Sequence, residues 1–166
     1  MPASINWDDY FMSLAILVSL RSKDPSSKVG AVLVNNNKII GTGYNGFPTG
    51  CDESQLPWER DIEKEGWLNT KYPYVIHAEA NALLNTVASP RGCSVYVTLF
   101  PCNECSKLLI QGGVKEVVYL KNKYPDQDAF VAANKILELT GIKIRELPAA
   151  DINLNLITEY FGSLSE

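Results

Sequence analysis

The chain has 166 residues, of which 46% are hydrophobic and 20% are charged, and its formal net charge is −4. This length suits one domain with a full hydrophobic core, so residues 1–166 are expected to form a single domain. No apolar run approaches the ~18 residues that span a membrane, and no basic segment precedes an apolar one at the N-terminus, which predicts a cytoplasmic protein without membrane contact. The acidic balance argues against a polymeric nucleic acid and favours a small-molecule partner.

The N-terminal part of the chain predicts a helix followed by a hairpin. Hydrophobic residues recur at helical spacing over residues 7–22, and Asn6 is a suitable N-cap for this helix. Two short apolar runs, 29–34 and 38–42, are separated by three asparagines, a pattern typical of a β-hairpin.

A long stretch without a clear strand, 44–75, follows the hairpin, with a short helix expected near 58–65. Insertions of this length in a compact domain are usually functional loops or lids. The remaining predicted elements are helices at 77–86, 102–111, 126–140 and 151–161 and strands at 94–99, 114–120 and 142–147. This order predicts an α/β fold in three layers, with a five-stranded mixed sheet and helices on both of its faces. Ligands of such sheets bind at the carboxyl ends of the strands, beside helix N-termini.

Residues of the kind that bind metals stand at the starts of two predicted helices. His77-Ala78-Glu79 opens one helix, and Pro101-Cys102-Asn103-Glu104-Cys105 opens the next. Cys102 and Cys105 are three residues apart, so they share a helix face, and the first turn of a helix favours the thiolate form. His77, the only histidine of the chain, supplies a third ligand of a type that zinc prefers.

The number of ligands predicts the kind of zinc site. A structural zinc usually has four protein ligands, whereas this pattern offers three and leaves a position for water, as in a catalytic site. Zinc lowers the pKa of bound water to about 7, and Glu79 is then placed to act as general acid and base. His-x-Glu followed by Pro-Cys-x-x-Cys is the known signature of zinc deaminases. Read alone, Cys102 and Cys105 could instead form a redox pair or part of a structural metal site. Cys51 and Cys93 are expected to be packing or loop residues.

At these residues the sequence resembles the cytidine and deoxycytidylate deaminase superfamily. The resemblance covers residues 7–147, and the blocks around the zinc motifs point to the deoxycytidylate branch. These blocks are Ser22–Ala31, Gly41–Gly46, Lys71–Ala82 and Leu99–Lys107. The resemblance implies one deaminase domain, residues 1–166, with the cytidine-deaminase-like three-layer α-β-α fold.

The same resemblance implies the reaction and its regulation. The expected reaction is the zinc-dependent hydrolysis of dCMP to dUMP and ammonia, in supply of thymidylate synthesis. The implied partners are dCTP as activator, dTTP as inhibitor and five further copies of the chain in a homohexamer, with magnesium accompanying a bound nucleotide effector. The alternatives are another deaminase of the superfamily, acting on cytidine, cytosine or tRNA adenosine, and a non-catalytic relative that binds nucleotide.

The resemblance also suggests contacts to the nucleotide. Asn45 matches the asparagine of the superfamily that hydrogen-bonds the sugar, since an amide can donate to and accept from hydroxyls; the alternative for Asn45 is a turn residue at the hairpin end. Lys28, with Ser26 and Ser27, is a candidate clamp for the phosphate. Solvated loop residues are the alternative reading of these three.

Two further sets complete the expected site. Ala78, inside the His-x-Glu motif, is expected to contact the substrate, and Tyr124 is expected to stack on or cover the nucleotide. The segment Gly43, Tyr44, Asn45 and Gly46 resembles the effector region of the family, so Asn45 is a candidate for either pocket.

Overall fold

The computed structural model describes residues 4–148 and residue 152. The helix predicted at 151–161 therefore lies outside the described residues. Within them, the elements follow the order that the sequence predicts, with shifted ends. They are α1 (Trp7–Ser19), β1 (Gly30–Asn35), β2 (Lys38–Tyr44), the 3₁₀ turn η1 (Glu53–Gln55), α2 (Ile62–Glu65), the 3₁₀ turn η2 (Trp67–Asn69), α3 (Ala78–Leu84), β3 (Ser94–Val97), α4 (Asn103–Gly112), β4 (Glu116–Tyr119), α5 (Asp128–Leu139) and β5 (Lys143–Glu146).

Local chemistry sets the ends of these helices. The side chain of Asn6 accepts a hydrogen bond from the Asp9 amide at 2.8 Å, which confirms Asn6 as the N-cap of α1. The helix ends at Ser19, three residues before the predicted end, because the following amides, as far as Ser22, donate to the carbonyl three residues back instead of four. Gly113 terminates α4 in the left-handed conformation, with φ of 78°, as a glycine at this position readily does.

The five strands form one mixed sheet in the order β2-β1-β3-β4-β5. Strand β1 is antiparallel to both β2 and β3, whereas β3, β4 and β5 are parallel to one another. Val95 lies opposite Leu33 on one side and Val117 on the other. The predicted mixed sheet of five strands is confirmed, and its parallel half brings the ends of β3 and β4 to one edge.

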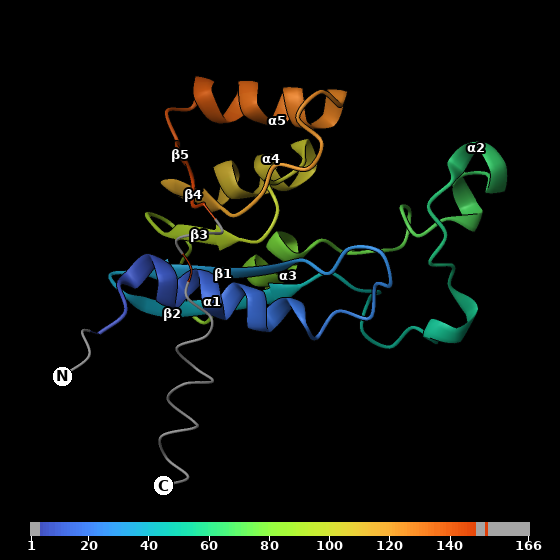
Figure 1. Ribbon diagram of the computed structural model, residues 1–166, viewed down its shortest axis with the longest axis horizontal. Coiled ribbons are helices and arrows are strands. Elements are labelled where there is room, and N and C mark those ends of the chain that lie inside the picture. The colour runs from blue at the N-terminus through green and yellow to red at the C-terminus, as the bar shows by residue number, and fades with distance from the viewer. Residues whose placement is uncertain (1–3, 149–151, 153–166) are drawn as a thin grey trace, which may run out of the picture.

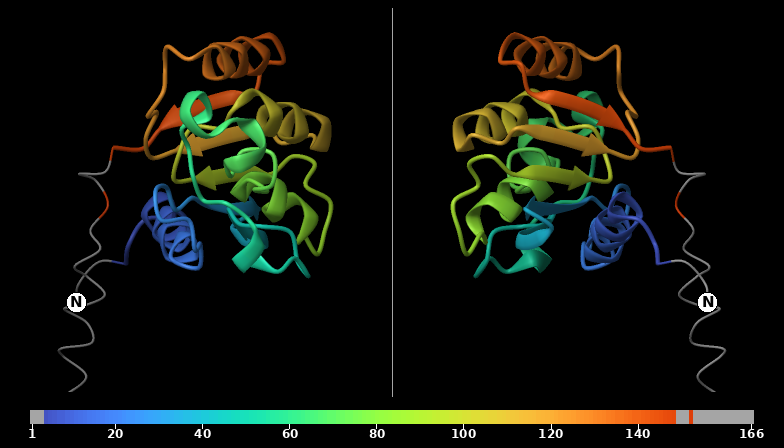
Figure 2. Two further views of the ribbon diagram at one scale, coloured as in Figure 1. Left: turned by 90° about the vertical axis from the view of Figure 1, so that its right-hand side faces the viewer. Right: turned by 90° about the vertical axis from the view of Figure 1, so that its left-hand side faces the viewer.

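Helices cover both faces of the sheet, as predicted. Figure 2 shows α1 on one side of the strands and α3 and α4 on the other, with α5 beside α4. Alternate strand residues fill the two cores: Val32 and Val118 pack with α1, whereas Leu33 and Val117 belong to the core under α3, α4 and α5. No helix among residues 4–148 has the length and apolar character needed to cross a bilayer.

A close contact between α3 and β2 fixes the start of α3. A Cβ atom added at Gly41 would come within 2.6 Å of the Ala82 carbonyl oxygen, and one at Gly43 would overlap the backbone of Ala78 and Ala82. Only glycine lets the helix lie this close to the strand. The packing therefore places His77, which precedes α3, at a defined point near the end of the sheet.

The long segment 45–76 leaves the sheet and returns to it. Its two ends are paired, because the Gly46 amide donates to the Ile76 carbonyl at 3.1 Å and the Ile76 amide donates to Gly46 at 2.9 Å. Between them the chain carries α2 and the two 3₁₀ turns, and it projects beyond the end of the sheet in Figure 1. The helix predicted near 58–65 is present in shorter form, as α2.

Candidate active site

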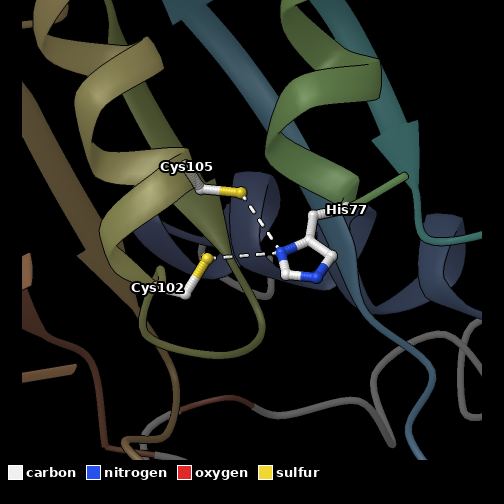
Figure 3. Close-up of side chains that lie close together, drawn as sticks. All are labelled: His77, Cys102 and Cys105. Carbon is white, nitrogen blue, oxygen red and sulfur yellow. Dashed lines mark hydrogen bonds between the residues drawn. The ribbon is translucent and has the colours of Figure 1, made fainter. Parts of the chain in front are cut away.

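The three predicted metal ligands come together at the starts of α3 and α4. His77 is the N-cap of α3, Cys102 is the N-cap of α4, and Cys105 lies in the first turn of α4. The Nδ1 atom of His77 is 3.4 Å from the Sγ atom of each cysteine, and Figure 3 shows all three side chains converging. All three donor atoms lie within 4.8 Å of one another.

The spacing of these donors fits zinc. A tetrahedral zinc with nitrogen at ~2.0 Å and sulfur at ~2.3 Å has its nitrogen and sulfur ligands about 3.5 Å apart. The measured 3.4 Å agrees with this separation. One histidine and two cysteines are also the donor types that zinc prefers. Among the residues described, this is the one group of three or more candidate ligands that lies within binding distance.

The protein's own groups already favour a thiolate here. Hydrogen bonding from Cys105 and His77 lowers the pKa of Cys102 to about 4, and the same contact with Cys102 raises the pKa of His77 to about 9. The hydrogen bond to Cys102 and burial both raise the pKa of Cys105. Cys105 therefore keeps its proton and donates it to the Cys102 thiolate. A cation placed among these donors would take over the role of that proton.

Glu79 is the second residue of α3, next to these donors. It is 4% exposed, and burial raises the pKa of its carboxyl above the ordinary value, although the positive charge of His77 opposes the shift. A raised pKa makes the carboxylate a stronger proton acceptor, as a general base requires. Glu79 is therefore suited to carry protons in the site.

A cavity of about 710 Å³ joins the metal donors to the long segment. Its floor contains His77, Glu79, Cys102 and Cys105, which come from the starts of α3 and α4. One wall comes from the segment 45–76 and another from the loop after β4 and the start of α5. The lining residues of these walls include Asn45, Arg60, Trp67, Lys71, Tyr72, Lys123, Tyr124 and Phe130. This volume is in the usual range for a pocket that encloses a small molecule.

A buried polar network supports the side of the cavity near Asn45. The Asp24 side chain has no exposed surface and forms an ion pair with Lys71, whose side chain is 9% exposed. Asp24 also accepts hydrogen bonds from the amides of Ser26 and Ser27, at 2.8 and 3.0 Å, and from Nδ2 of Asn45 at 3.1 Å. The network ties the loop between α1 and β1 to the long segment, across 47 positions of sequence.

Asn45 is held by its neighbours on both sides of its amide. Its Nδ2 donates to Asp24 and to the Ser27 carbonyl at 3.0 Å, and its Oδ1 accepts from the Val29 amide at 2.8 Å. Both N–H groups are thus used, and one lone pair of Oδ1 is free for a further donor. Asn45 is 5% exposed, so the turn reading and the ligand reading of the sequence are compatible.

The structure brings some of the other predicted contacts to the cavity and leaves others outside it. Ser27, Ala78 and Tyr124 line the cavity, as Asn45 does, whereas Ser26 and Lys28 are exposed and are not among the lining residues.

Of the predicted effector segment, Gly43, Tyr44 and Gly46 do not line the cavity. Gly43 has a clear structural use in the contact of β2 with α3. The Tyr44 carbonyl accepts a hydrogen bond from Asn81 of α3 at 2.8 Å, which strengthens the same contact.

Several lining residues were not predicted. Arg60, Trp67 and Lys123 lie in loops or short turns without periodicity, so no local pattern marks them. Tyr72 was also not predicted, although it follows Lys71 in the same block of the family resemblance. Lys71 stands within one of the blocks that carry the family resemblance, and this block was the only signal that could have singled it out.

Comparison with known proteins identifies the family to which this chain belongs. The family model described as the cytidine and deoxycytidylate deaminase zinc-binding region matches residues 5–121. The chain belongs to the cytidine and deoxycytidylate deaminase family. Its membership makes it a zinc-dependent hydrolase, in accord with the His77, Cys102 and Cys105 group.

Individual members of the deaminase family can be compared with this chain. Proteins named deoxycytidylate deaminase from Mus musculus and Homo sapiens are 53% and 51% identical to it over 144 residues, which cover 86% of this chain and 80% of each relative. The crystal structure of the dCMP deaminase of cyanophage S-TIM5, in complex with dCMP and dUMP, superimposes with a TM-score of 0.69 at 30% identity. The superposition covers 88% of this chain and all of the phage protein.

Proposed function

We propose that this member of the family hydrolyses dCMP to dUMP and ammonia. The observation that carries the proposal is the buried carboxyl of Glu79 beside three zinc donors in one cavity of about 710 Å³. The choice of dCMP is supported by the names of the two mammalian relatives and by the nucleotides bound to the phage enzyme.

His77, Cys102 and Cys105 would hold the zinc, which when bound supplies Lewis-acid activation of water near neutral pH. Glu79 moves the protons. Hydrolysis forms a bond between C4 of cytosine and the oxygen of water and breaks the bond between C4 and the amino group. One proton of the water ends on N3 and the other on the leaving ammonia. A carboxylate oxygen of Glu79 accepts each proton in turn and delivers it, first to N3 and then to the amino nitrogen.

The nucleotide is held by residues that line the same cavity. The free lone pair of Asn45 Oδ1 accepts a hydrogen bond from a sugar hydroxyl, and the Asp24 network keeps that oxygen in place. Ala78 and Tyr124 contact the substrate, Tyr124 by covering it. The sequence suggests Ser26, Ser27 and Lys28 as a phosphate clamp, but of these three only Ser27 lines the cavity.

Regulation and assembly are part of the same proposal. The chain is activated by dCTP, with magnesium, and inhibited by dTTP, and it works as a homohexamer in the cytoplasm. The segment from Gly43 to Gly46 is its proposed effector region, and Asn45 belongs to both sets of contacts.

The test measures ammonia release from dCMP, deoxycytidine, cytidine and cytosine, with and without dCTP. Glu79→Gln keeps the size of the side chain but removes the proton carrier, so turnover of dCMP should fall by at least ~10²-fold. Its zinc content should stay at the wild-type level. Glu138→Gln, an exposed change on α5, is the matched control. Wild-type turnover by Glu79→Gln, or preference for another substrate of the panel, would contradict the proposal.

A further inference from the structure

The positive side chains of the cavity are not equivalent. Three basic residues line it: Arg60, Lys71 and Lys123. Lys71 is neutralised by the buried carboxylate of Asp24. Arg60 and Lys123 form no ion pair with a carboxylate anywhere in residues 4–148. The net positive charge available to a ligand therefore comes from Arg60 and Lys123.

Arg60 is flanked by two tyrosines from different walls. Its Nη2 donates a hydrogen bond to the hydroxyl of Tyr124 at 3.0 Å, and its interaction with Tyr72 raises the pKa of the guanidinium. Lys123 lies over the ring of the same Tyr124, with its Nζ 5.2 Å from the ring centroid. Neutral partners fix the guanidinium without neutralising it, so its charge and its remaining N–H groups are available to an anion.

We propose that Arg60, with Lys123 as a second cation, binds the 5′-phosphate of the nucleotide substrate and thereby makes the enzyme prefer dCMP to deoxycytidine. The inference rests on the proposed function. A guanidinium presents a planar pair of N–H donors that matches two phosphate oxygens, and a lysine adds a point charge. Lys71 is not part of the proposed phosphate site, because the buried Asp24 carboxylate already neutralises its charge.

The proposal differs from the clamp that the sequence suggests. Lys28 and Arg60 are both exposed to solvent, but Arg60 lines the cavity together with Glu79 and the zinc donors, whereas Lys28 does not. A phosphate bound by Arg60 and a base bound over Glu79 would occupy one continuous cavity. If Arg60 binds the phosphate, Arg60→Gln should lose the preference for dCMP and Lys28→Gln should keep it. If Lys28 binds the phosphate, the results for the two variants should be reversed.

The experiment compares kcat/KM for dCMP and for deoxycytidine at a fixed dCTP concentration. Arg60→Gln should lower kcat/KM for dCMP by roughly 10- to 100-fold, the effect of losing charge-assisted hydrogen bonds, and should leave deoxycytidine nearly unchanged. Arg21→Gln, an exposed change outside the cavity, removes the same charge and should alter neither value. Arg60→Lys should recover part of the preference for dCMP. Equal losses for both substrates, no loss for either, or a selective loss of dCMP in Lys28→Gln but not in Arg60→Gln would overturn the proposal.

A binding measurement separates this inference from the proposed reaction. Titration calorimetry on zinc-loaded Glu79→Gln, with dCMP and with deoxycytidine, reports the preference for phosphate without turnover. Adding Arg60→Gln to this variant should weaken dCMP binding by roughly 10- to 100-fold and leave deoxycytidine as it was. If dCMP binds equally well with and without Arg60, the inference is wrong, whether or not the wild-type chain deaminates dCMP.

Discussion

Replacing Lys71 with methionine tests whether the buried ion pair with Asp24 holds the long segment against the rest of the domain. The change leaves the Asp24 carboxylate fully buried without its cation. Removing one partner of a buried pair typically costs about 3–5 kcal/mol. Asp24 keeps three N–H donors, from Ser26, Ser27 and Asn45, at 2.8–3.1 Å. Because these donors still solvate the carboxylate in part, we expect a loss of about 3 kcal/mol, at the lower end of that range.

The free energy of unfolding is measured by urea denaturation of the zinc-loaded protein at pH 7. Lys64→Met is the matched control. Lys64 pairs with Glu65 at the surface, where its side chain is 76% exposed, so this change should leave the free energy of unfolding close to the wild-type value. In the double variant Asp24→Asn, Lys71→Met no buried charge is left alone, so it should be more stable than the sum of the single changes predicts, by about 2 kcal/mol.

Two results would refute this reasoning. One is a Lys71→Met protein within about 1 kcal/mol of wild type, which would mean that the three remaining donors, or water, compensate the carboxylate. The other is strict additivity in the double variant, which would mean that the two side chains do not stabilise each other. An increase in KM for dCMP with little change in kcat should accompany the loss of stability, because Asp24 also orients Asn45.

Three shorter predictions follow from other contacts. Elemental analysis should give about one zinc per chain, and Cys102→Ser should lose it whereas Cys51→Ser should not. Gly43→Ala should lower the free energy of unfolding by at least about 2 kcal/mol in urea denaturation, because its methyl group would overlap the backbone of α3. Hydrogen bonding from Arg145 lowers the pKa of Asp8 below its ordinary value of 3.8, so this contact stabilises the fold above about pH 4 and is lost as the pH falls further. Asp8→Asn should therefore be less stable than wild type at pH 7 by at most about 1 kcal/mol, and the difference measured by thermal unfolding should shrink below pH 4.

Sequence patterns were sufficient for the sheet, the helices that cover it and the floor of the site. The apolar run of residues 29–34, the N-cap at Asn6 and the two helix-opening motifs are local features, and each is visible within a few residues. The contact of His77 with Cys102 spans 25 positions, yet it could be predicted because parallel strands bring successive helix starts to one edge.

The walls of the cavity could not be predicted in the same way. Arg60 meets Tyr124 across 64 positions, and Lys71 meets Asp24 across 47. Neither pair belongs to a repeating element, so periodicity gives no information on it. Lys28 was chosen for its charge and its place between helix and strand, but the chain turns its side chain to solvent while the neighbouring Ser27 lines the cavity.

The backbone pairing of Gly46 with Ile76 has a consequence for how this fold can change. Because both hydrogen bonds are made by main-chain atoms, they depend little on which side chains stand there. The chain between them is a closed loop whose ends stay fixed, and doubling the length of such a loop costs only about 0.6 kcal/mol. Insertions, deletions and substitutions can therefore reshape this wall of the cavity while His77, the residue after Ile76, stays where it is. Substrate choice and metal chemistry can evolve separately in this architecture, with the pairing at the base of the segment as the boundary between them.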